Sequence, residues 1–417
     1  NCPPPCGLVL VDDGSSPETA ELVRRFADRL GAVHIVNEQA HGYTRAANQG
    51  LAASSADFAL LLNSDTVVTP GWIERLVACA ESDPRIGIVG PLANTASWQS
   101  VPDIVEDGDW AANPLPPDVS VEKMAELVAR YAGRLYPEMP FLNGFCLLIR
   151  RRLLEEIGPF DEAVFGAGYG EENDFALRAR AAGWKLALAD DVYIHHAQSK
   201  SYSSEQRNRL SSLANEALLR KHGRARVEEG VAFCHSDRVL AGIRARARTS
   251  VERARLVDHG HVEFAGKRVL FVLPARGPGG GANIVFCEAR AMRAMGVDAV
   301  VFNLDRFRED FEQAYPNLDV PVVYGDYDDV PRSLIERIDE CDAMVATLYA
   351  SVGALREVAR APGGDRLAFG YYIQDFEPYF FEPGGDDFHR AWQSYSLMPQ
   401  LVRFTKTDWN QRELRTL

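Results

Sequence analysis

The sequence predicts an α/β protein with two successive Rossmann-like domains, and two observations indicate this fold class. First, short apolar runs that suit strands buried on both faces, such as residues 56–62, alternate with segments of helical periodicity. Second, a new strand–helix–strand series starts at residue 267, after a polar, arginine-rich stretch. We therefore expect an α/β domain over residues 1–222, a helical linker over 223–266 and a second α/β domain over 267–417.

Strands and helices alternate in order through the first region. Ser16 and Pro17 are favoured at a helix start, and Gly31 suits the end of the helix that they open. The expected elements are strands at residues 8–11, 33–36 and 56–62, and helices at 17–30, at 43–53 and from 70 onward. Taken by itself, this alternation predicts a parallel sheet with crossover helices.

The composition excludes several classes of protein. Hydrophobic residues make up 46% of the 417 residues and charged residues 25%, as in soluble globular proteins. The net charge of -14 argues against a chain-wide nucleic-acid-binding surface. No apolar run approaches the ~20 residues that a membrane-spanning helix needs. Seven scattered cysteines without a CxxC pair favour reduced thiols in the cytoplasm over a disulfide framework or a zinc site.

Acidic residues follow two of the expected strands. Asp12 and Asp13 end the first strand, and the run at 56–62 is followed by Asn63, Ser64 and Asp65. Each group alone suits an ordinary turn. Because ligands bind at the carboxyl ends of strands in open α/β sheets, two such ends at one edge of one sheet predict a polar ligand cleft. An acid there is a candidate for holding a metal or a sugar.

Further polar residues follow an insertion at residues 94–140 that we expect to border this cleft. Glu171, Glu172 and Asp174 occupy the first turn of a helix, where the helix dipole favours acids whatever their function. Glycines just before them also allow the backbone to bring these acids close to a ligand. His195 and His196 end a strand, and a histidine pair at this place is either structural or a metal ligand.

Taken in order, these residues resemble the nucleotide-sugar glycosyltransferases of family two, which have the GT-A fold. The resemblance implies a mixed Rossmann-like sheet with helices. The motifs that carry it are Asp12-Asp13-Gly14-Ser15, Arg45-Ala46-Ala47-Asn48, Asn63-Ser64-Asp65, Asn143-Gly144, Asp161-Glu162, Glu171-Glu172-Asn173-Asp174 and His196.

The resemblance implies a role for each matching residue on the donor side. Asp65 resembles the last acid of the family's DxD signature, which holds Mn²⁺ or Mg²⁺ against the donor diphosphate, and Asn63 replaces the first acid. His196 would add a metal or phosphate contact. The residues implied in binding the nucleotide sugar are Asp12, Asp13, Arg45, Asn48, Asn63 and Asp65.

On the acceptor side, Glu172 matches the catalytic carboxylate, which would remove the proton of the acceptor hydroxyl in an inverting, single in-line attack. Gly144 and Glu171 are further candidates for binding the acceptor. Asp161 and Asp174 are either acceptor-side or supporting residues. The family normally begins with one more strand and helix, so we expect a destabilised domain and an incomplete nucleotide pocket.

The second region contains a glycine-rich loop between a strand and a helix. Gly277-x-Gly279-x-x-Ala282, with Asp305 further on, fits the dinucleotide-binding fingerprint, which leaves a dehydrogenase-type domain as an alternative. This loop and the aromatic–acidic run at 371–381 resemble the N-terminal half of family-four GT-B glycosyltransferases, nearest to bacterial rhamnosyltransferases. The candidate residues of this region are Gly279, Gly280, Gly281, Asp375 and Glu377.

The sequence therefore predicts a metal-dependent, inverting glycosyltransferase of bacterial surface polysaccharide synthesis, in the cytoplasm or at the inner face of the membrane. Its partners would be a UDP-, dTDP- or GDP-linked sugar and a glycan or lipid-linked acceptor, with no nucleic acid. The alternative from another class is a non-catalytic sugar-binding or scaffolding module. We expect residues 238–255 to form a solvated linker helix, and docking of this basic helix to an anionic membrane is a minor alternative.

Overall fold

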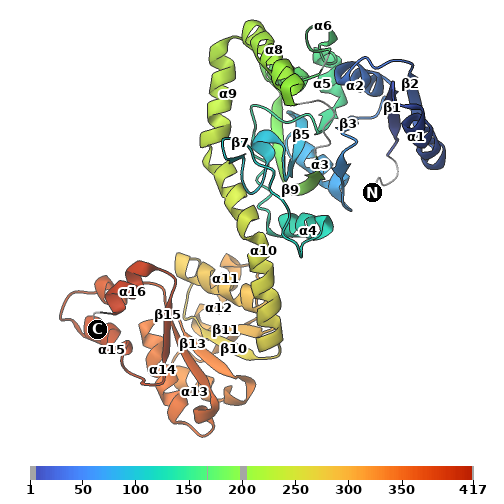
Figure 1. The fold of residues 1–417 in the computed structure, drawn as a ribbon. Coiled ribbons are helices and arrows are strands. Elements are labelled where there is room, and N and C mark those ends of the chain that lie inside the picture. The colour runs from blue at the N-terminus through green and yellow to red at the C-terminus, as the bar shows by residue number, and fades with distance from the viewer. Residues whose placement is uncertain (1–5, 167, 198–203, 416–417) are drawn as a thin grey trace. The chain divides into compact units, whose positions relative to one another are not determined.

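The computed structural model describes residues 6–166, 168–197 and 204–415, with the elements shown in Figure 1. The chain divides into two compact units, residues 1–252 and 253–417. Each unit has its own sheet and hydrophobic core. The predicted fold class, a mixed α/β sheet with helices followed by a second α/β domain, is confirmed.

A five-stranded mixed sheet forms the centre of the first unit. Its strands are, in spatial order, β3 (Phe58–Leu62), β8 (Cys146–Arg150), β5 (Ile86–Ala93), β9 (Lys185–His196) and β4 (Thr66–Val67). Strand β8 runs antiparallel to both β3 and β5, whereas β5 and β9 are parallel. The prediction of a purely parallel sheet from alternation is therefore wrong, and the mixed sheet implied by the family resemblance is correct.

The first two strands form a sheet of their own. Strands β1 (Val9–Asp13) and β2 (Val33–Asn37) pair in parallel with each other and, within the described residues, with no strand of the five-stranded sheet. Asp12 and Asp13 thus end a strand of one sheet, while Asp65 follows a strand of another. The expectation that they share one edge of one sheet is wrong, because β3 pairs with the antiparallel β8 and not with β1.

Helices and a small hairpin complete the first unit up to β9. The helices are α1 (Pro17–Leu30), α2 (Tyr43–Ala52), α3 (Trp72–Glu81), α4 (Val121–Tyr131), α5 (Arg151–Ile157), α6 (Glu162–Phe165) and α7 (Glu171–Ala181), and the hairpin strands are β6 (Val105–Glu106) and β7 (Asp109–Trp110). The expected caps of α1 are present: the Ser16 side chain accepts a hydrogen bond from Thr19 N, and Gly31 has a φ of 63°. The expected helix start and end therefore form as predicted.

The core of the first unit has two layers, one on each face of the five-stranded sheet. Alternate residues of β8 and β9 enter the two layers, as the two-residue period of a strand requires. One layer holds Leu147 and Leu188, and the other, which contains Leu76 of α3, holds Leu148 and Ala189. Both faces of the sheet are therefore covered by hydrophobic side chains.

Replacing Leu76 with alanine is expected to destabilise the first unit by about 2–5 kcal/mol, the usual cost of truncating a buried leucine. The Leu76 side chain is 0% exposed, so the change leaves a cavity beneath α3. Urea-induced unfolding followed by tryptophan fluorescence measures the loss. Leu22→Ala is the matched control because Leu22 is 50% exposed, and equal losses in the two variants would contradict the buried position of Leu76.

Three consecutive helices connect the two sheets along the chain: α8 (Ser204–His222), α9 (Arg224–Ser236) and α10 (Arg238–Phe264). Leu240, Ile243 and Ala247 of α10 are buried in the core of the first unit. This part of the helix is therefore not the solvated linker that we expected, because its apolar side has a packing partner. No helix in the described ranges is long and apolar enough to cross a bilayer.

The second unit is built around a six-stranded sheet in which every strand is parallel to its neighbours. The spatial order is β12 (Val322–Gly325), β11 (Asp298–Leu304), β10 (Arg268–Val272), β13 (Ala343–Ala346), β14 (Ala368–Ile373) and β15 (Val402–Thr405). Its helices are α11 (Gly280–Ala294), α12 (Arg308–Ala314), α13 (Val330–Ile335), α14 (Tyr349–Arg360), α15 (Asp386–Ser394) and α16 (Asp408–Leu414). The order reverses between β10 and β13, which is where doubly wound sheets bind ligands.

Candidate active site

Asp65 and His196 meet at one end of the five-stranded sheet. Asp65 lies in the turn between β3 and β4, and β4 pairs with the end of β9 so that Thr66 is opposite His196. This pairing brings Asp65 Oδ1 to 3.4 Å from His196 Nε2, with 16% and 13% of the two side chains exposed. Two residues that are distant in the sequence are thus brought together at the place where a donor-binding site was predicted.

Neighbouring residues fix the orientation of the His196 ring. Its Nδ1 lies 2.9 Å from the carbonyl oxygen of Thr95, and since a carbonyl only accepts, Nδ1 carries the hydrogen. The ring also stacks on Phe145 at a centroid distance of 5.1 Å. Asn94 accepts a hydrogen bond from the His196 backbone and donates one to its carbonyl. Because Nδ1 donates to Thr95, Nε2 is the ring nitrogen that faces the Asp65 carboxylate.

This pair fits part of a divalent metal's ligand shell. Mg²⁺-type ions are commonly held by one or two carboxylates together with substrate phosphates rather than by a complete protein cage. Within the described residues, no group of three or more His, Cys, Asp or Glu side chains is arranged to hold a metal ion. The donor set of Asp65 and His196 thus suits an ion that a nucleoside diphosphate also binds.

Asn63 lies on the same turn, and its backbone holds the turn in place. Asn63 N donates to the Phe145 carbonyl oxygen at 2.9 Å, and Thr66 Oγ1 donates to the Asn63 carbonyl oxygen at 2.8 Å. The turn that carries Asp65 is therefore tied to the same residue, Phe145, on which His196 stacks.

Glu172 lies in the first turn of α7, and the residues directly before this helix have left-handed backbone conformations. Gly168, Tyr169 and Gly170 have φ values of 90°, 70° and 87°. The amide of Gly170 donates to Glu172 Oε2, and Asn173 Nδ2 donates to Oε1, both at 3.1 Å. A Cβ atom on Gly144 would lie 3.6 Å from the Glu172 Cβ, so the backbone at this glycine packs directly against the acid.

Burial raises the pKa of both Glu171 and Glu172, and the charge of Glu172 raises that of Glu171 further. Glu171 is 4% exposed, and its Oε2 finds no hydrogen-bond partner among the residues that the structure describes. A carboxylate with a raised pKa is a better proton acceptor near neutral pH than an ordinary glutamate. Glu172 therefore has the raised pKa expected of a general base, and Glu171 is a second buried carboxyl group beside it.

The turn after β2 connects the small sheet to this site. Asp13 accepts hydrogen bonds from the amides of His41 and Gly42, and the hydroxyl of the next residue, Tyr43, donates to the Gly144 carbonyl oxygen at 3.2 Å. Burial opposes ionisation of Asp13, but the hydrogen bonds from His41, Asn37 and Gly42 hold its pKa below the usual range. Asp13 is thus an ionised residue linked through Tyr43 and Gly144 to the neighbourhood of Glu172.

The other residues predicted to bind the nucleotide sugar differ in their exposure and in whether their side chains are already hydrogen-bonded within the protein. Asp12 is buried and accepts from Ser15 N, and Arg45 is exposed on α2. Asn48 is committed elsewhere, because its amide donates to the Phe160 carbonyl oxygen at 2.9 Å and accepts from the Phe160 amide at 3.0 Å. These bonds tie α2 to the segment before α6, which is a supporting position rather than one facing a ligand.

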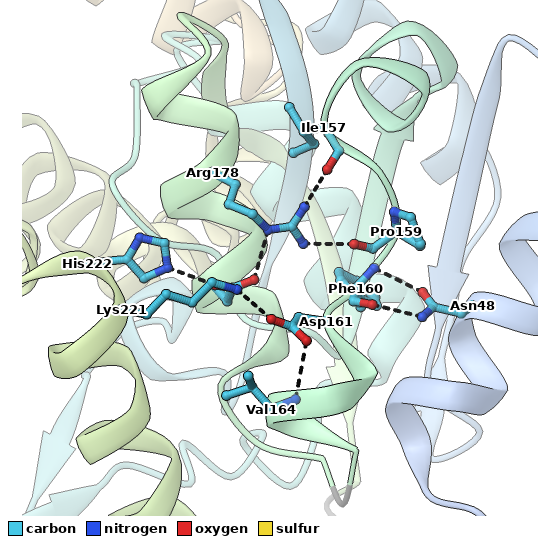
Figure 2. A network of polar contacts seen from close by, with 10 residues as sticks. Asn48, Ile157, Pro159, Phe160, Asp161, Val164, Arg178, Lys221 and His222 are labelled. Atoms are coloured by element: carbon cyan, nitrogen blue, oxygen red, sulfur yellow. Dashed lines mark hydrogen bonds and ion pairs between the residues drawn. The ribbon is translucent and has the colours of Figure 1, made fainter.

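Asp161 and Asp174, for which acceptor-side and supporting roles were both open, lie in a network of ion pairs (Figure 2). Asp174 is 0% exposed and Asp161 pairs with Lys221. Their contacts are those of supporting residues.

In the second unit the glycine-rich loop precedes α11, which has Gly279 as its N-cap. Residues 273–279 separate β10 from the helix, and Asp305 follows β11. Asp375 is exposed. Glu377 is buried and accepts from the Tyr349 amide and the Tyr371 hydroxyl, both at 2.9 Å, and burial raises its pKa to about 7.

Several residues around the site were missed in the sequence. Asn94 and Thr95 fall in a stretch that we treated as an insertion, yet they directly follow β5 and fix His196. The signal was available, because a polar pair after an apolar strand is the same pattern that singled out Asp65. Tyr43 carried no signal of its own, since its contact with Gly144 joins residues that are distant in the chain.

Residues 2–158 match the sequence profile of Glycosyl transferase family 2. The N-acetylglucosaminyl-diphospho-decaprenol L-rhamnosyltransferase of Mycobacterium tuberculosis is 27% identical over 234 residues, which cover 50% of this chain and 72% of that protein. The hyaluronan synthase of Pasteurella multocida is 23% identical over 219 residues, 48% of this chain and 22% of that protein. A solved mannosyltransferase from Pyrobaculum calidifontis, in complex with GDP-Man and Mn²⁺, is 16% identical with a TM-score of 0.34, covering 59% of this chain and 77% of its own. Residues 2–158 are thus similar to family 2 glycosyl transferases, and the chain that carries them is a glycosyltransferase.

Proposed function

We propose that the first unit is a metal-dependent, inverting glycosyltransferase that transfers a sugar from a nucleotide sugar to a glycan or lipid-linked acceptor. The observation that carries the proposal is that two adjacent residues, Gly144 and Phe145, contact the candidate base and the candidate metal-binding pair, respectively. His196, paired with Asp65, stacks on Phe145, while Glu172 packs against Gly144. A donor diphosphate at the metal-binding pair would place its sugar near the candidate base.

On the donor side, Asp65 and His196 would hold Mn²⁺ or Mg²⁺. The ion supplies positive charge that stabilises the departing nucleoside diphosphate. Asp13 is ionised and accepts hydrogen bonds from the turn before α2, and it is the candidate for binding the nucleoside. Arg45, exposed on α2, is a candidate for binding the phosphates. Asn63, in the same turn as Asp65, is a further candidate for contacting the donor.

On the acceptor side, Glu172 would take the proton of the attacking hydroxyl. The oxygen then forms a bond to the anomeric carbon as the bond from that carbon to the diphosphate oxygen breaks, so the configuration inverts. Hydrogen bonds from Gly170 and Asn173 orient the Glu172 carboxylate. Glu171 and the backbone at Gly144 border the same place and are the candidates for contacting the acceptor.

The acceptor class is inferred from the relatives. The name of the mycobacterial relative includes a decaprenyl diphosphate-linked sugar as acceptor and L-rhamnose as the transferred sugar. By analogy we propose a lipid-linked acceptor at the cytoplasmic face of a membrane, in the synthesis of a bacterial surface polysaccharide. A non-catalytic sugar-binding module is the competing function, and it would bind without turnover.

For the second unit we propose the N-terminal half of a GT-B glycosyltransferase of family four. The parallel sheet, the glycine-rich loop before α11 and the buried Glu377 after β14 support it. The competing proposal, a dinucleotide-binding domain, is supported by Asp305, which follows β11. Thermal shifts with NAD⁺ and NADP⁺ separate the two proposals, because only the dinucleotide-binding domain predicts a shift.

The proposed function is tested by the melting temperature of the protein with UDP, GDP or dTDP, each with Mn²⁺ or with EDTA. A ligand that binds only the folded state at 100 times its Kd stabilises it by about 2.7 kcal/mol. We expect one nucleotide to raise the melting temperature in Mn²⁺ and to lose most of this effect in EDTA. No shift with any of the three would overturn the proposal.

The pH dependence of transfer is a second consequence. Glu172 acts as a base only when ionised, and burial raises its pKa, so kcat/KM is expected to fall as the pH drops through a value above the usual glutamate range. Glu171→Gln leaves the burial of Glu172 in place, so the acid limb of this variant should also lie above the usual glutamate range. Glu155→Gln, on the exposed side of α5, is the control. An acid limb at the ordinary glutamate pKa would contradict the assignment.

A further inference from the structure

The last residues of α8 point into the first unit and bind the helix that carries the candidate base. His222 Nε2 lies 2.7 Å and Lys221 Nζ 2.8 Å from Asp174 Oδ1. Arg178, one turn further along α7, donates to Asp174 Oδ2 at 2.8 Å. Figure 2 shows Lys221 and His222 extending from the neighbouring helix toward the helix that carries Arg178.

This arrangement keeps a fully buried carboxylate ionised. Burial by itself would raise the pKa of Asp174, but hydrogen bonds from Lys221, His222 and Arg178 hold it below its usual range. Removing one partner from a buried charge is costly because the remaining charge is left in a medium of low polarity. Asp174 therefore holds α8 and α7 together only as long as its partners are in place.

The same network fixes the segment that leads to α6. Lys221 Nζ also lies 2.6 Å from Asp161 Oδ2, and Asp161 Oδ1 accepts from the Val164 amide at the start of α6. Arg178 donates to the carbonyl oxygens of Ile157 and Pro159, at 2.7 and 2.8 Å. All of these contacts are visible in Figure 2. The loop 157–161, α6, α7 and the end of α8 thus form one connected polar network.

Asp174 is linked to the candidate base by two hydrogen bonds. Its amide donates to the Gly170 carbonyl oxygen at 2.9 Å, and the Gly170 amide donates to Glu172 Oε2 at 3.1 Å. The side chain of Asp174 is held by α8, and its backbone holds the residue that orients Glu172. Arg178 belongs to α7 itself, so Lys221 and His222 are the members of this set that tie Asp174 to another helix.

We propose that Lys221 and His222 are positioning residues for the transfer reaction, which set the orientation of Glu172 through Asp174 and Gly170. This inference rests on the proposed function, because it assigns a role relative to the candidate base. Neither residue is placed in the donor site, which lies at Asp65 and His196. Their loss should therefore act on turnover and not on donor binding.

The test compares kcat, the donor KM and the Mn²⁺–nucleotide thermal shift in five variants. Because small displacements of a reacting group can cost up to about 10²-fold in rate, we expect Lys221→Met and His222→Ala to lower kcat by roughly 10–100-fold. The donor KM and the thermal shift should stay within about twofold of the wild type. Lys221→Arg and His222→Gln, which keep a hydrogen-bond donor, should recover most of kcat. Arg220→Met, next to them on the exposed side of α8, should leave kcat unchanged.

Unchanged kcat in folded Lys221→Met and His222→Ala would overturn the inference, as would a loss that appears only in the donor KM. Circular dichroism checks folding, and if both variants fail to fold, His222→Asn is measured against the same two outcomes. Failure of the proposed function has a different signature, in which the wild type transfers no sugar in the same assay. That result would remove the basis of both proposals.

Discussion

The Glu172→Gln variant is expected to lose sugar transfer by about 10²–10⁴-fold, the usual contribution of a general base, while binding the donor as the wild type does. Glutamine has the same shape but does not take up the proton of the acceptor hydroxyl. Gly170 and Asn173 donate to different oxygens of the carboxylate, so the variant keeps one of these two hydrogen bonds. Transfer is measured with a labelled nucleotide sugar, and donor binding by calorimetry in Mn²⁺.

Glu155→Gln is the matched control for this variant, since Glu155 lies exposed on α5. Full transfer by Glu172→Gln would show that the base is another residue, with Glu171 as the next candidate because of its burial and raised pKa. Absence of transfer in both the wild type and the variant, with intact donor binding, would favour the non-catalytic module.

The Asp65→Ala variant is expected to lose the Mn²⁺-dependent stabilisation by a nucleoside diphosphate. The ion would be held by Asp65 and His196, and without the carboxylate only one protein donor remains beside the diphosphate. At 100 times Kd the lost stabilisation is about 2.7 kcal/mol, which for a unit of this size corresponds to a melting temperature lower by roughly 5–10 °C in the presence of ligand. Differential scanning fluorimetry with and without Mn²⁺ measures this difference.

Asp57→Ala is the control, because Asp57 is exposed at the opposite end of β3. The melting temperature of Asp65→Ala without ligand should stay close to that of the wild type, so that the loss reports binding and not folding. An undiminished nucleotide shift in Asp65→Ala, in Mn²⁺, would place the donor site elsewhere.

The pairing of Asp65 with His196 is the part of the site that the sequence predicted best. His196 ends an apolar strand and Asp65 follows one, and polar residues at strand ends are informative about function whatever the strand order. Their meeting depends on the short strand β4, which pairs with β9 antiparallel. Strand order itself was not predictable, since periodicity reveals that a segment is a strand but not which strand lies beside it. For this reason Asp12 and Asp13 were placed on the wrong sheet.

Supporting residues were the least predictable part. Asn48 matched a donor-side motif, but its amide binds the backbone of Phe160, which is distant in the sequence. Asp174 suited the first turn of a helix, yet two of its three side-chain partners come from the end of α8. Such contacts join residues far apart in the chain, and neither composition nor spacing reveals them. The local features, such as the Ser16 cap and the Gly31 end of α1, were predicted correctly because they depend only on neighbouring residues.

The central claim is that Asp65, His196 and Glu172 together carry out metal-dependent sugar transfer. Its most direct test is the release of nucleoside diphosphate from a panel of UDP-, dTDP- and GDP-linked sugars, with a lipid-linked acceptor and either Mn²⁺ or EDTA. We expect the wild type to release one nucleoside diphosphate in Mn²⁺ with formation of a product of inverted anomeric configuration, and both Asp65→Ala and Glu172→Gln to release almost none. Release that is equally fast in EDTA, or in both variants, would contradict the claim.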